Sequence, residues 1–290
     1  MHPAKRYRIR PGRKVRLGRW DPAERCELAR TDKTARASLD DLLPRIDRLQ
    51  ALLWAEHRHR VLLVLQGMDT AGKDATIRRV FEGVNPQGVS VARFGPPTPE
   101  EAAHDFLWRA HLKAPGHGEV VIFNRSHYED VLIVRVHKLV PRSVWSRRYE
   151  LINGFEKMLA ENGTRILKFY LHISPDEQLA RFKQRLDDPA RHWKISDSDY
   201  VEREFWPKYI EAYEDVFAKT STEWAPWYVI PANHKWFRDL AISAIVADTM
   251  AEMNLRFPPS QVDLTAIRRK YHAAKLEAST GRQSVGVRAV

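Results

Sequence analysis

A glycine-rich stretch that could bind phosphate lies at residues 67–74, where the chain reads GMDTAGKD. Gly67, Gly72 and Lys73 match the spacing of a phosphate-binding loop, or P-loop, in which backbone amides and a lysine hold phosphate oxygens. The match departs from the usual pattern at two positions. Asp74 stands where a Ser or Thr hydroxyl is expected, and Asp69 adds a carboxylate inside the loop. The stretch therefore predicts phosphate binding together with two acids that need a partner.

A divalent cation would reconcile these acids with a phosphate. A carboxylate repels polyphosphate unless a cation lies between them, and Mg²⁺ prefers carboxylate and phosphate oxygens. Asp69 and Asp74 are therefore candidate metal ligands. Asp74 could equally be a helix-start acid that interacts with the helix dipole. The residues expected to contact phosphate here are Gly67, Met68, Thr70, Ala71, Gly72, Lys73 and Asp74.

A second polar cluster follows the apolar run that ends in FNRSHYED, residues 123–130. Ligands of open α/β sheets bind at the carboxyl ends of strands, so this corner could face the same phosphate as the P-loop. Arg125 can bind phosphate oxygens with two parallel hydrogen bonds. Glu129 or Asp130 could complete a metal site, whereas His127 fits a structural hydrogen-bonding role better than that of a base. The alternative is a surface turn with helix-start acids.

A third cluster, in RFKQRLDDPARHWKIS at residues 181–196, is basic. Cations between two helices of a P-loop protein suggest a lid that closes over phosphates and excludes water. The alternative is a solvated basic face. We favour a lid because Asp188, Pro189 and a Trp193 that we expect to be buried interrupt the helical pattern. The cluster comprises Arg181, Lys183, Arg185, Arg191, His192 and Lys194.

The elements that must position these clusters alternate along the chain. Short apolar runs predict strands at 60–66, 89–94, 119–126, 165–174 and 227–232. Helical spacing predicts helices at 38–59 with a kink or turn at Pro44, 74–84, 98–114, 128–136, 142–161, 174–188, within 189–220, and 234–253. This alternation predicts an α/β sandwich with a mostly parallel, five-stranded sheet and helices on both faces.

Composition limits the class of protein. The 290 residues carry a net charge of +11, which suggests a polyanionic partner such as nucleic acid, anionic lipid or a phosphate polymer. The single cysteine, Cys26, cannot form an internal disulfide and is interpreted as a structural or incidental thiol. The basic N-terminal stretch has no apolar core typical of a secretory signal, and no apolar run reaches 18 residues. A cytoplasmic protein is expected.

Taken together, the motifs resemble those of the family-2 polyphosphate kinases. The resemblance extends from about Tyr7 to Pro258 and rests on GMDTAGKD, PTPEEAAHDFLWR, FNRSHYEDVLIVRVH, RHWKIS and YVIPANHKWFRDL. It implies a thymidylate-kinase-like P-loop fold, a three-layer α/β/α sandwich with a helical lid. It also implies reversible phosphoryl transfer between inorganic polyphosphate and nucleotides with Mg²⁺ or Mn²⁺, by a homodimer or homotetramer.

The resemblance also assigns roles to individual residues. It implies that Asp69, Lys73, Arg125 and the lid arginine Arg185 are catalytic, and we expect Arg191 and Lys194 to bind phosphate. Many members have Asp-Arg-Ser after the third strand, where this chain has Asn124, so Glu129 becomes the candidate second metal ligand. The variant FNRSHYEDV resembles the subgroup that phosphorylates both AMP and ADP.

The chain is thus expected to comprise a basic N-terminal arm (1–30), a P-loop kinase domain (31–258) with a lid at about 181–200, and a basic tail (259–290). Expected partners are inorganic polyphosphate and ADP, AMP or ATP, with neither membrane nor nucleic acid. Two alternatives remain open. One is an ATP-dependent nucleoside or nucleotide kinase, and the other is a basic nucleic-acid-binding protein with a degenerate P-loop. No helix-turn-helix, RNA-recognition or zinc signature supports the second.

Overall fold

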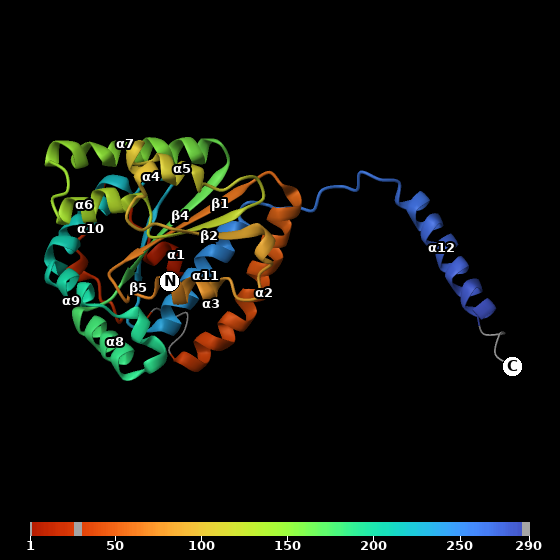
Figure 1. Cartoon of the computed structure of the whole chain (residues 1–290), viewed down its shortest axis with the longest axis horizontal. Coiled ribbons are helices and arrows are strands. Elements are labelled where there is room, and N and C mark those ends of the chain that lie inside the picture. Colours follow the sequence, from red (N-terminus) through yellow and green to blue (C-terminus); the bar gives the residue numbers. More distant parts are fainter. Residues whose placement is uncertain (1, 26–30, 286–290) are drawn as a thin grey trace. The chain divides into compact units, whose positions relative to one another are not determined.

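A computed structural model describes residues 2–25 and 31–285 of the chain (Figure 1). The described residues fall into two compact units, Met1–Arg256 and Phe257–Val290. Within the described part of the first unit, five strands form an all-parallel sheet in the order β2-β3-β1-β4-β5. They are β1 (Arg60–Gly67), β2 (Val89–Arg93), β3 (Val120–Asn124), β4 (Thr164–His172) and β5 (Trp227–Pro231).

Helices cover both faces of this sheet, as Figure 1 shows. On one side lie α3 (Lys73–Val80) and α11 (Lys235–Ala251), with α2 (Asp32–Glu56) packed along α11. On the other lie α7 (Arg142–Glu161) and α10 (Trp206–Thr220). The central strands read as continuous apolar runs because both of their faces are buried. The predicted three-layer α/β/α fold is confirmed.

Short elements connect these layers. They are α1 (Pro3–Arg6), η1 (Leu17–Arg19), η2 (Pro86–Gly88), α4 (Pro99–Ala103), α5 (Trp108–Leu112), η3 (His127–Val131), α6 (Ile133–Val136), α8 (Pro175–Asp187), η4 (Pro189–Lys194) and α9 (Asp197–Glu204). The segment predicted as the lid, about 181–200, thus spans the end of α8, the whole of η4 and the start of α9.

Three helix predictions differ from the structure. The first helix begins earlier than predicted, where Thr31 forms a capping box with Thr34, and it continues through Pro44 instead of turning there. The helix predicted at 98–114 is two short helices, and the side chain of Asp105 accepts a hydrogen bond from the Leu107 amide between them. The long helix predicted after the lid is divided into α9 and α10, because Pro207 begins a new helix.

The basic N-terminal segment belongs to the first compact unit. Tyr7 and Ile9 are buried in the core. The Ile9 amide donates to the Trp227 carbonyl (2.8 Å) and the Val229 amide donates to the Tyr7 carbonyl (3.0 Å). The predicted arm is therefore paired with the edge strand β5. Cys26 lies outside the described residues.

The second unit contains α12 (Leu264–Val285), and it corresponds to the segment that we expected to be a basic tail. The side chains of Leu264, Ile267, Tyr271 and Leu276 on α12 are exposed. Within the described residues of the chain, no helix combines the length and the apolar composition that a membrane span requires.

Candidate phosphoryl-transfer site

The P-loop connects the end of β1 to the start of α3 and needs both of its glycines. Gly72 has φ of +103°, and a Cβ atom there would lie 1.9 Å from Nη1 of Arg238. A Cβ atom on Gly67 would lie 3.0 Å from the Leu171 carbonyl oxygen in the neighbouring strand. The spacing of the motif is therefore fixed by a left-handed turn and by close packing of the loop.

Side chains from α8 and α11 hold the carbonyl groups of this loop. Arg181 Nη1 donates to the carbonyls of Thr70 (2.8 Å) and Ala71 (3.0 Å), and Arg238 Nη1 donates to that of Ala71 (3.3 Å). Gln178 Nε2 donates to the Asp69 carbonyl (3.1 Å). The sequence placed Arg181 among the lid cations. The structure shows that Arg181 also supports the P-loop. The spacing of residues in the sequence does not indicate this contact.

Lys73, the P-loop lysine, folds back over its own loop. Its Nζ donates to the carbonyl oxygens of Gly67 (2.8 Å) and Met68 (3.3 Å). Burial, with a contribution from the nearby Arg125 guanidinium, lowers the Lys73 pKa to about 8, although the charge of Asp69 opposes this shift. Lys73 also lines the main cavity described below, so its charge faces any ligand bound there.

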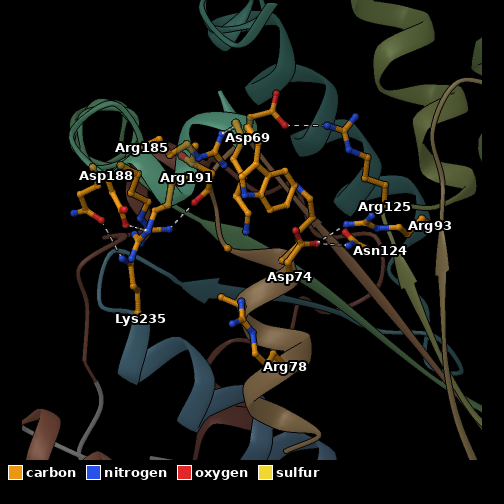
Figure 2. A pocket seen from close by; sticks show the side chains of 18 of the residues that line it. Asp69, Asp74, Arg78, Arg93, Asn124, Arg125, Arg185, Asp188, Arg191 and Lys235 are labelled. Atoms are coloured by element: carbon orange, nitrogen blue, oxygen red, sulfur yellow. Dashed lines mark hydrogen bonds and ion pairs between the residues drawn. The ribbon is translucent and has the colours of Figure 1, made fainter. Parts of the chain in front are cut away.

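Asp69 and Arg125 join the P-loop to the end of β3. Arg125 Nη2 lies 2.9 Å from Asp69 Oδ1, as Figure 2 shows. Arg125 has φ of +60°, a left-handed conformation that is uncommon for this residue type, and its amide donates to the Leu65 carbonyl (3.1 Å). Burial lowers the Arg125 pKa, but the charges of Glu129 and Asp69 outweigh that effect and leave the pKa raised. The structure thus brings together the two clusters that the sequence placed at neighbouring strand ends.

Asp74 and Asn124 form a second link between the same elements. Asn124 Nδ2 donates to Asp74 Oδ1 (2.6 Å), and Arg93 Nη2 lies 3.7 Å from the same oxygen (Figure 2). Asp74 also lies in the first turn of α3, as the helix-dipole interpretation requires. Both interpretations of Asp74 are therefore compatible with its position. Asn124 thus holds Asp74 in place.

Glu129, the candidate second metal ligand, lies in η3 and faces a smaller cavity of about 270 Å³. Asp69 and Arg125 line the same cavity. Burial raises the Glu129 pKa, although the charges of Arg125 and Lys73 oppose this shift. Asp130, the alternative ligand, instead pairs with Arg148 (3.0 Å) and lines neither cavity.

The carboxylates do not form a ready-made metal cage. Across residues 2–25 and 31–285, no three His, Cys, Asp or Glu side chains gather closely enough to hold a metal ion. Mg²⁺ usually takes only one or two protein carboxylates and completes its shell with phosphate oxygens and water. The buried Thr70 hydroxyl, beside Asp69 in the loop, has no hydrogen-bond partner among the described residues. This oxygen-rich donor set fits Mg²⁺ bound together with a phosphate.

The predicted lid carries Arg185, Arg191 and Lys194 along the edge of the main cavity. Arg185 donates to the Lys194 carbonyl and lies 3.7 Å from the Asp199 carboxylate. Arg191 pairs with Asp188 (2.8 Å; Figure 2).

The expectation that Trp193 is buried is wrong, because its side chain is 77% exposed. It lies on the short 3₁₀ helix η4, which has no buried residue. The indole Nε1 donates to the Ala190 carbonyl (3.0 Å), and Lys194 Nζ lies 4.8 Å from the ring centre. Trp193 therefore presents a ring surface at the cavity instead of anchoring the turn.

These elements surround a cavity of about 900 Å³ at the carboxyl ends of β1 and β3 (Figure 2). Among the described residues, ten lysine and arginine side chains line it, against three aspartates. Sequence reasoning did not assign Arg78, Arg93, Lys235 and Arg238 to the site. They come from α3, β2 and α11, and only the fold shows that they converge. The cavity is suited to ligands that carry several negative charges.

A buried charged network lies beneath the polar corner. Lys168 Nζ contacts Glu156 Oε2 (2.5 Å) and the Tyr128 hydroxyl (2.8 Å), and Lys168 and Glu156 are both fully buried. His127 Nε2 lies 3.4 Å from Glu156 Oε1, so His127 has the structural role that we expected. The network anchors the segment between Arg125 and Glu129.

Comparisons with known proteins agree with this geometry. The family model described as polyphosphate kinase 2 matches residues 28–258. The chain is 52% identical to an AMP/ADP-polyphosphate phosphotransferase of Meiothermus ruber over 88% of this chain and 95% of that protein. It is 42% identical to an ADP-polyphosphate phosphotransferase of Rhodopseudomonas palustris over 92% and 94%. The crystal structure of polyphosphate kinase 2 from Arthrobacter aurescens superposes with a TM-score of 0.90 at 42% identity, covering 94% of this chain and 97% of that one.

Proposed function

The chain belongs to the polyphosphate kinase 2 family, and we propose that it transfers phosphoryl groups from inorganic polyphosphate to ADP and AMP. The relatives named for AMP and ADP support this proposal, because the chain matches them over nearly their full length. The transfer is reversible in this proposal, because the bond broken in polyphosphate and the bond formed in ADP or ATP are both phosphoanhydride bonds.

The observation that carries the proposal is the excess of cations around the cavity, ten against three acids among the described residues. Transfer between two polyanions requires that both approach one place despite their mutual repulsion. Phosphoryl transfer depends mainly on positioning and on stabilising charge, with little covalent chemistry by the protein. A P-loop at the base of such a cavity can both position the phosphates and stabilise their charge.

In the proposed reaction, a terminal phosphate oxygen of AMP or ADP attacks the terminal phosphorus of polyphosphate. The bond from that phosphorus to the bridging oxygen breaks, and the shortened polyphosphate leaves as an anion. Lys73 and Arg125 stabilise charge on the transferred group, and Arg185 adds charge from the lid. The P-loop amides, with Arg191 and Lys194, position the phosphates of the two substrates.

We propose Mg²⁺ as the cofactor, with Mn²⁺ as an alternative. Asp69 would hold it together with Glu129 or Asp74, since Asp69 lines both cavities, Glu129 the smaller and Asp74 the larger. When bound, the cation neutralises phosphate charge. The chain's own contribution is to fix Asp69 beside Arg125, so that the carboxylate and the guanidinium lie next to each other at the cavity wall.

We further propose that the protein acts in the cytoplasm, as a homodimer or homotetramer, with ATP as a product and as the donor in the reverse reaction. The small-molecule substrates and a single cysteine fit a reducing compartment. The net charge of +11 fits a polyanionic donor.

The decisive experiment incubates the purified protein with Mg²⁺ and long-chain polyphosphate as the sole donor. AMP and ADP are supplied separately, and ADP and ATP are measured by chromatography. Products from both acceptors are expected. Activity with ADP alone would refute the AMP part of the proposal. No product from either, while ATP phosphorylates a nucleotide, would identify an ATP-dependent kinase instead.

A salt titration of DNA and RNA binding, without turnover, addresses the nucleic-acid alternative. Tight, strongly salt-dependent binding by a protein that forms no nucleotide product would favour that alternative.

A further inference from the structure

Thr70 in the P-loop has a backbone conformation that its neighbours must hold. Its φ is +65°, in the left-handed region that β-branched residues rarely adopt because it costs free energy. Such a conformation persists only where the surrounding structure fixes the peptide groups on either side of the residue. The hydrogen bonds to these two peptide groups therefore control the shape of the loop.

Two side chains of α8 hold these peptide groups by their carbonyls. Gln178 Nε2 donates to the Asp69 carbonyl (3.1 Å), which belongs to the peptide group before Thr70. Arg181 Nη1 donates to the Thr70 carbonyl (2.8 Å), which belongs to the peptide group after it. The C=O and N–H of a trans peptide group point in opposite directions. Because the Asp69 carbonyl points toward Gln178, the Thr70 amide points away from it.

The Thr70 amide is thereby left for a ligand. Within the described part of the chain, no group accepts a hydrogen bond from it, whereas the next amide, that of Ala71, donates to the Met68 carbonyl (3.1 Å). Thr70 also lines the main cavity. Backbone amides of a P-loop bind phosphate oxygens, so the orientation of this peptide group bears directly on phosphate binding.

Gln178 is itself held by a helix that begins within the lid. Its side chain is 2% exposed, and its Oε1 accepts a hydrogen bond from Arg203 Nη1 on α9 (2.8 Å). Arg203 Nη1 also donates to the Pro175 carbonyl at the start of α8 (2.9 Å). Since Arg203 can only donate, the oxygen of the Gln178 amide must face α9 and its NH₂ group must face the P-loop.

We propose that Gln178 is a positioning residue for phosphoryl transfer, which turns the Thr70 amide toward the phosphate, and that Arg203 makes this orientation depend on the packing of α9. The lid then acts on the P-loop through a chain of hydrogen bonds from Arg203 through Gln178 to the Asp69 carbonyl. The coupling works in both directions, so a phosphate bound at the P-loop stabilises the packing of α9. The kinetic consequences rest on the proposed function.

Three variants of the full chain test the two links separately. Gln178→Met keeps the size of the side chain but removes its donor and its acceptor. Gln178→Glu keeps an acceptor for Arg203 but places a carboxylate against the Asp69 carbonyl. Arg203→Met removes the contact with α9 alone.

The first kinetic test compares the two substitutions of Gln178, with polyphosphate as donor and ADP as acceptor. Gln178→Met should lower kcat about tenfold, because a displaced amide stabilises less charge in the transition state. The KM for ADP should change less than about threefold. Gln178→Glu should be at least as impaired, because its carboxylate repels the carbonyl. If Gln178 served only to pack α9, Gln178→Glu would be the more active of the two, and this order would overturn the proposal.

The second kinetic test is a double-mutant cycle. Arg203→Met should lower kcat about fivefold in the wild-type background and have no further effect in the Gln178→Met background. Losses that multiply would show that the two contacts act independently, against the proposal. Gln50→Met is the matched control, because Gln50 is a 1% exposed glutamine on α2 and does not line the cavity; its kcat should equal that of the wild type. Arg203 is partly exposed, so Arg203→Met keeps the proposal testable if the Gln178 variants fail to fold.

Amide hydrogen exchange with tripolyphosphate as the ligand needs no turnover. Tripolyphosphate should slow exchange in both the P-loop and α9 of the wild type, but only in the P-loop of Gln178→Met. Equal protection of α9 in the two proteins would overturn the proposal, as would a wild-type kcat in Gln178→Met. A wild-type chain that shows the expected exchange pattern but transfers no phosphate from polyphosphate would refute the proposed function and leave this inference standing.

Discussion

Replacing Lys168 with methionine should strongly destabilise the fold, although the two side chains are similar in length. Lys168 lies in β4, an inner strand of the sheet, with no exposed surface. Its Nζ contacts Glu156 Oε2 (2.5 Å), the Tyr128 hydroxyl (2.8 Å) and the Thr220 carbonyl (2.7 Å). Methionine fills the space but leaves the Glu156 carboxylate buried without its cation.

The size of the destabilisation depends on the charge that stays buried, which is the Glu156 carboxylate. Removing one member of a buried ion pair typically costs about 3–5 kcal/mol, because the other charge stays buried and uncompensated. Replacing Glu156 with leucine in the Lys168→Met background should recover most of this loss. A remainder of about 1–2 kcal/mol is expected from the Tyr128 hydroxyl and the Thr220 carbonyl, which lose their partners.

The dependence of stability on pH should also change sign. In the wild-type protein burial alone would raise the Glu156 pKa, but Lys168 and His127 outweigh it and lower the pKa. That contribution is present above the unfolded pKa of Glu156 and is lost as the pH falls through the lowered folded pKa. In Lys168→Met burial dominates and raises the Glu156 pKa. The variant should therefore lose stability as the pH rises from 5.5 to 8, by up to about 1.4 kcal/mol per pH unit.

Urea unfolding at both pH values measures these quantities. Lys219→Met is the control, because Lys219 is half-exposed on α10 and pairs with Asp215 at 3.5 Å, an interaction worth less than about 1 kcal/mol. A Lys168→Met loss no larger than that of the control would refute the reasoning. Equal stability of the variant at the two pH values would show that Glu156 is not left as an isolated buried acid.

Three further predictions concern the site. Lys73→Ala should lower kcat/KM for polyphosphate-dependent transfer about 100-fold or more with an unchanged circular dichroism spectrum, and near-wild-type activity would remove Lys73 from the mechanism. Asp69→Asn should raise the Mg²⁺ concentration needed for half-maximal activity, and an unchanged Mg²⁺ titration would exclude a ligand role. Trp193→Ala should raise the KM for AMP and ADP about tenfold with little effect on that for polyphosphate, if the exposed ring stacks on the base. KM values for AMP and ADP that equal those of the wild-type protein would exclude such stacking.

The sequence predicted best what depends on local pattern. Apolar runs located the strands, and the spacing of Gly67, Gly72 and Lys73 identified the loop, because both signals lie within a few consecutive residues. The division of 98–114 into two helices was missed, since it depends on a short turn around Asp105 that helical periodicity does not reveal.

Contacts between distant elements could not be predicted in this way. Lys168 reads as a polar residue within an apolar strand, and its partner Glu156 lies on a different element, α7. Arg181 reads as one basic residue among several in its segment, yet it contacts P-loop carbonyls more than 100 positions away in the chain. Trp193 was expected to be buried because tryptophan is usually well buried, whereas the 3₁₀ turn of the lid exposes it.

The fold explains how the P-loop can contain two acids. Asp69 pairs with Arg125, and Asp74 accepts a hydrogen bond from Asn124, so the end of β3 supplies a partner for each acid. The side chains of Asp69 and Arg125 are 28% and 40% exposed, which leaves both within reach of a ligand. A phosphate that binds Arg125 weakens the ion pair between Arg125 and Asp69. The Asp69 carboxylate is then better placed to bind a cation. Phosphate and metal binding are thereby expected to reinforce each other, and this coupling is a physical reason for a phosphate-binding loop to contain acids.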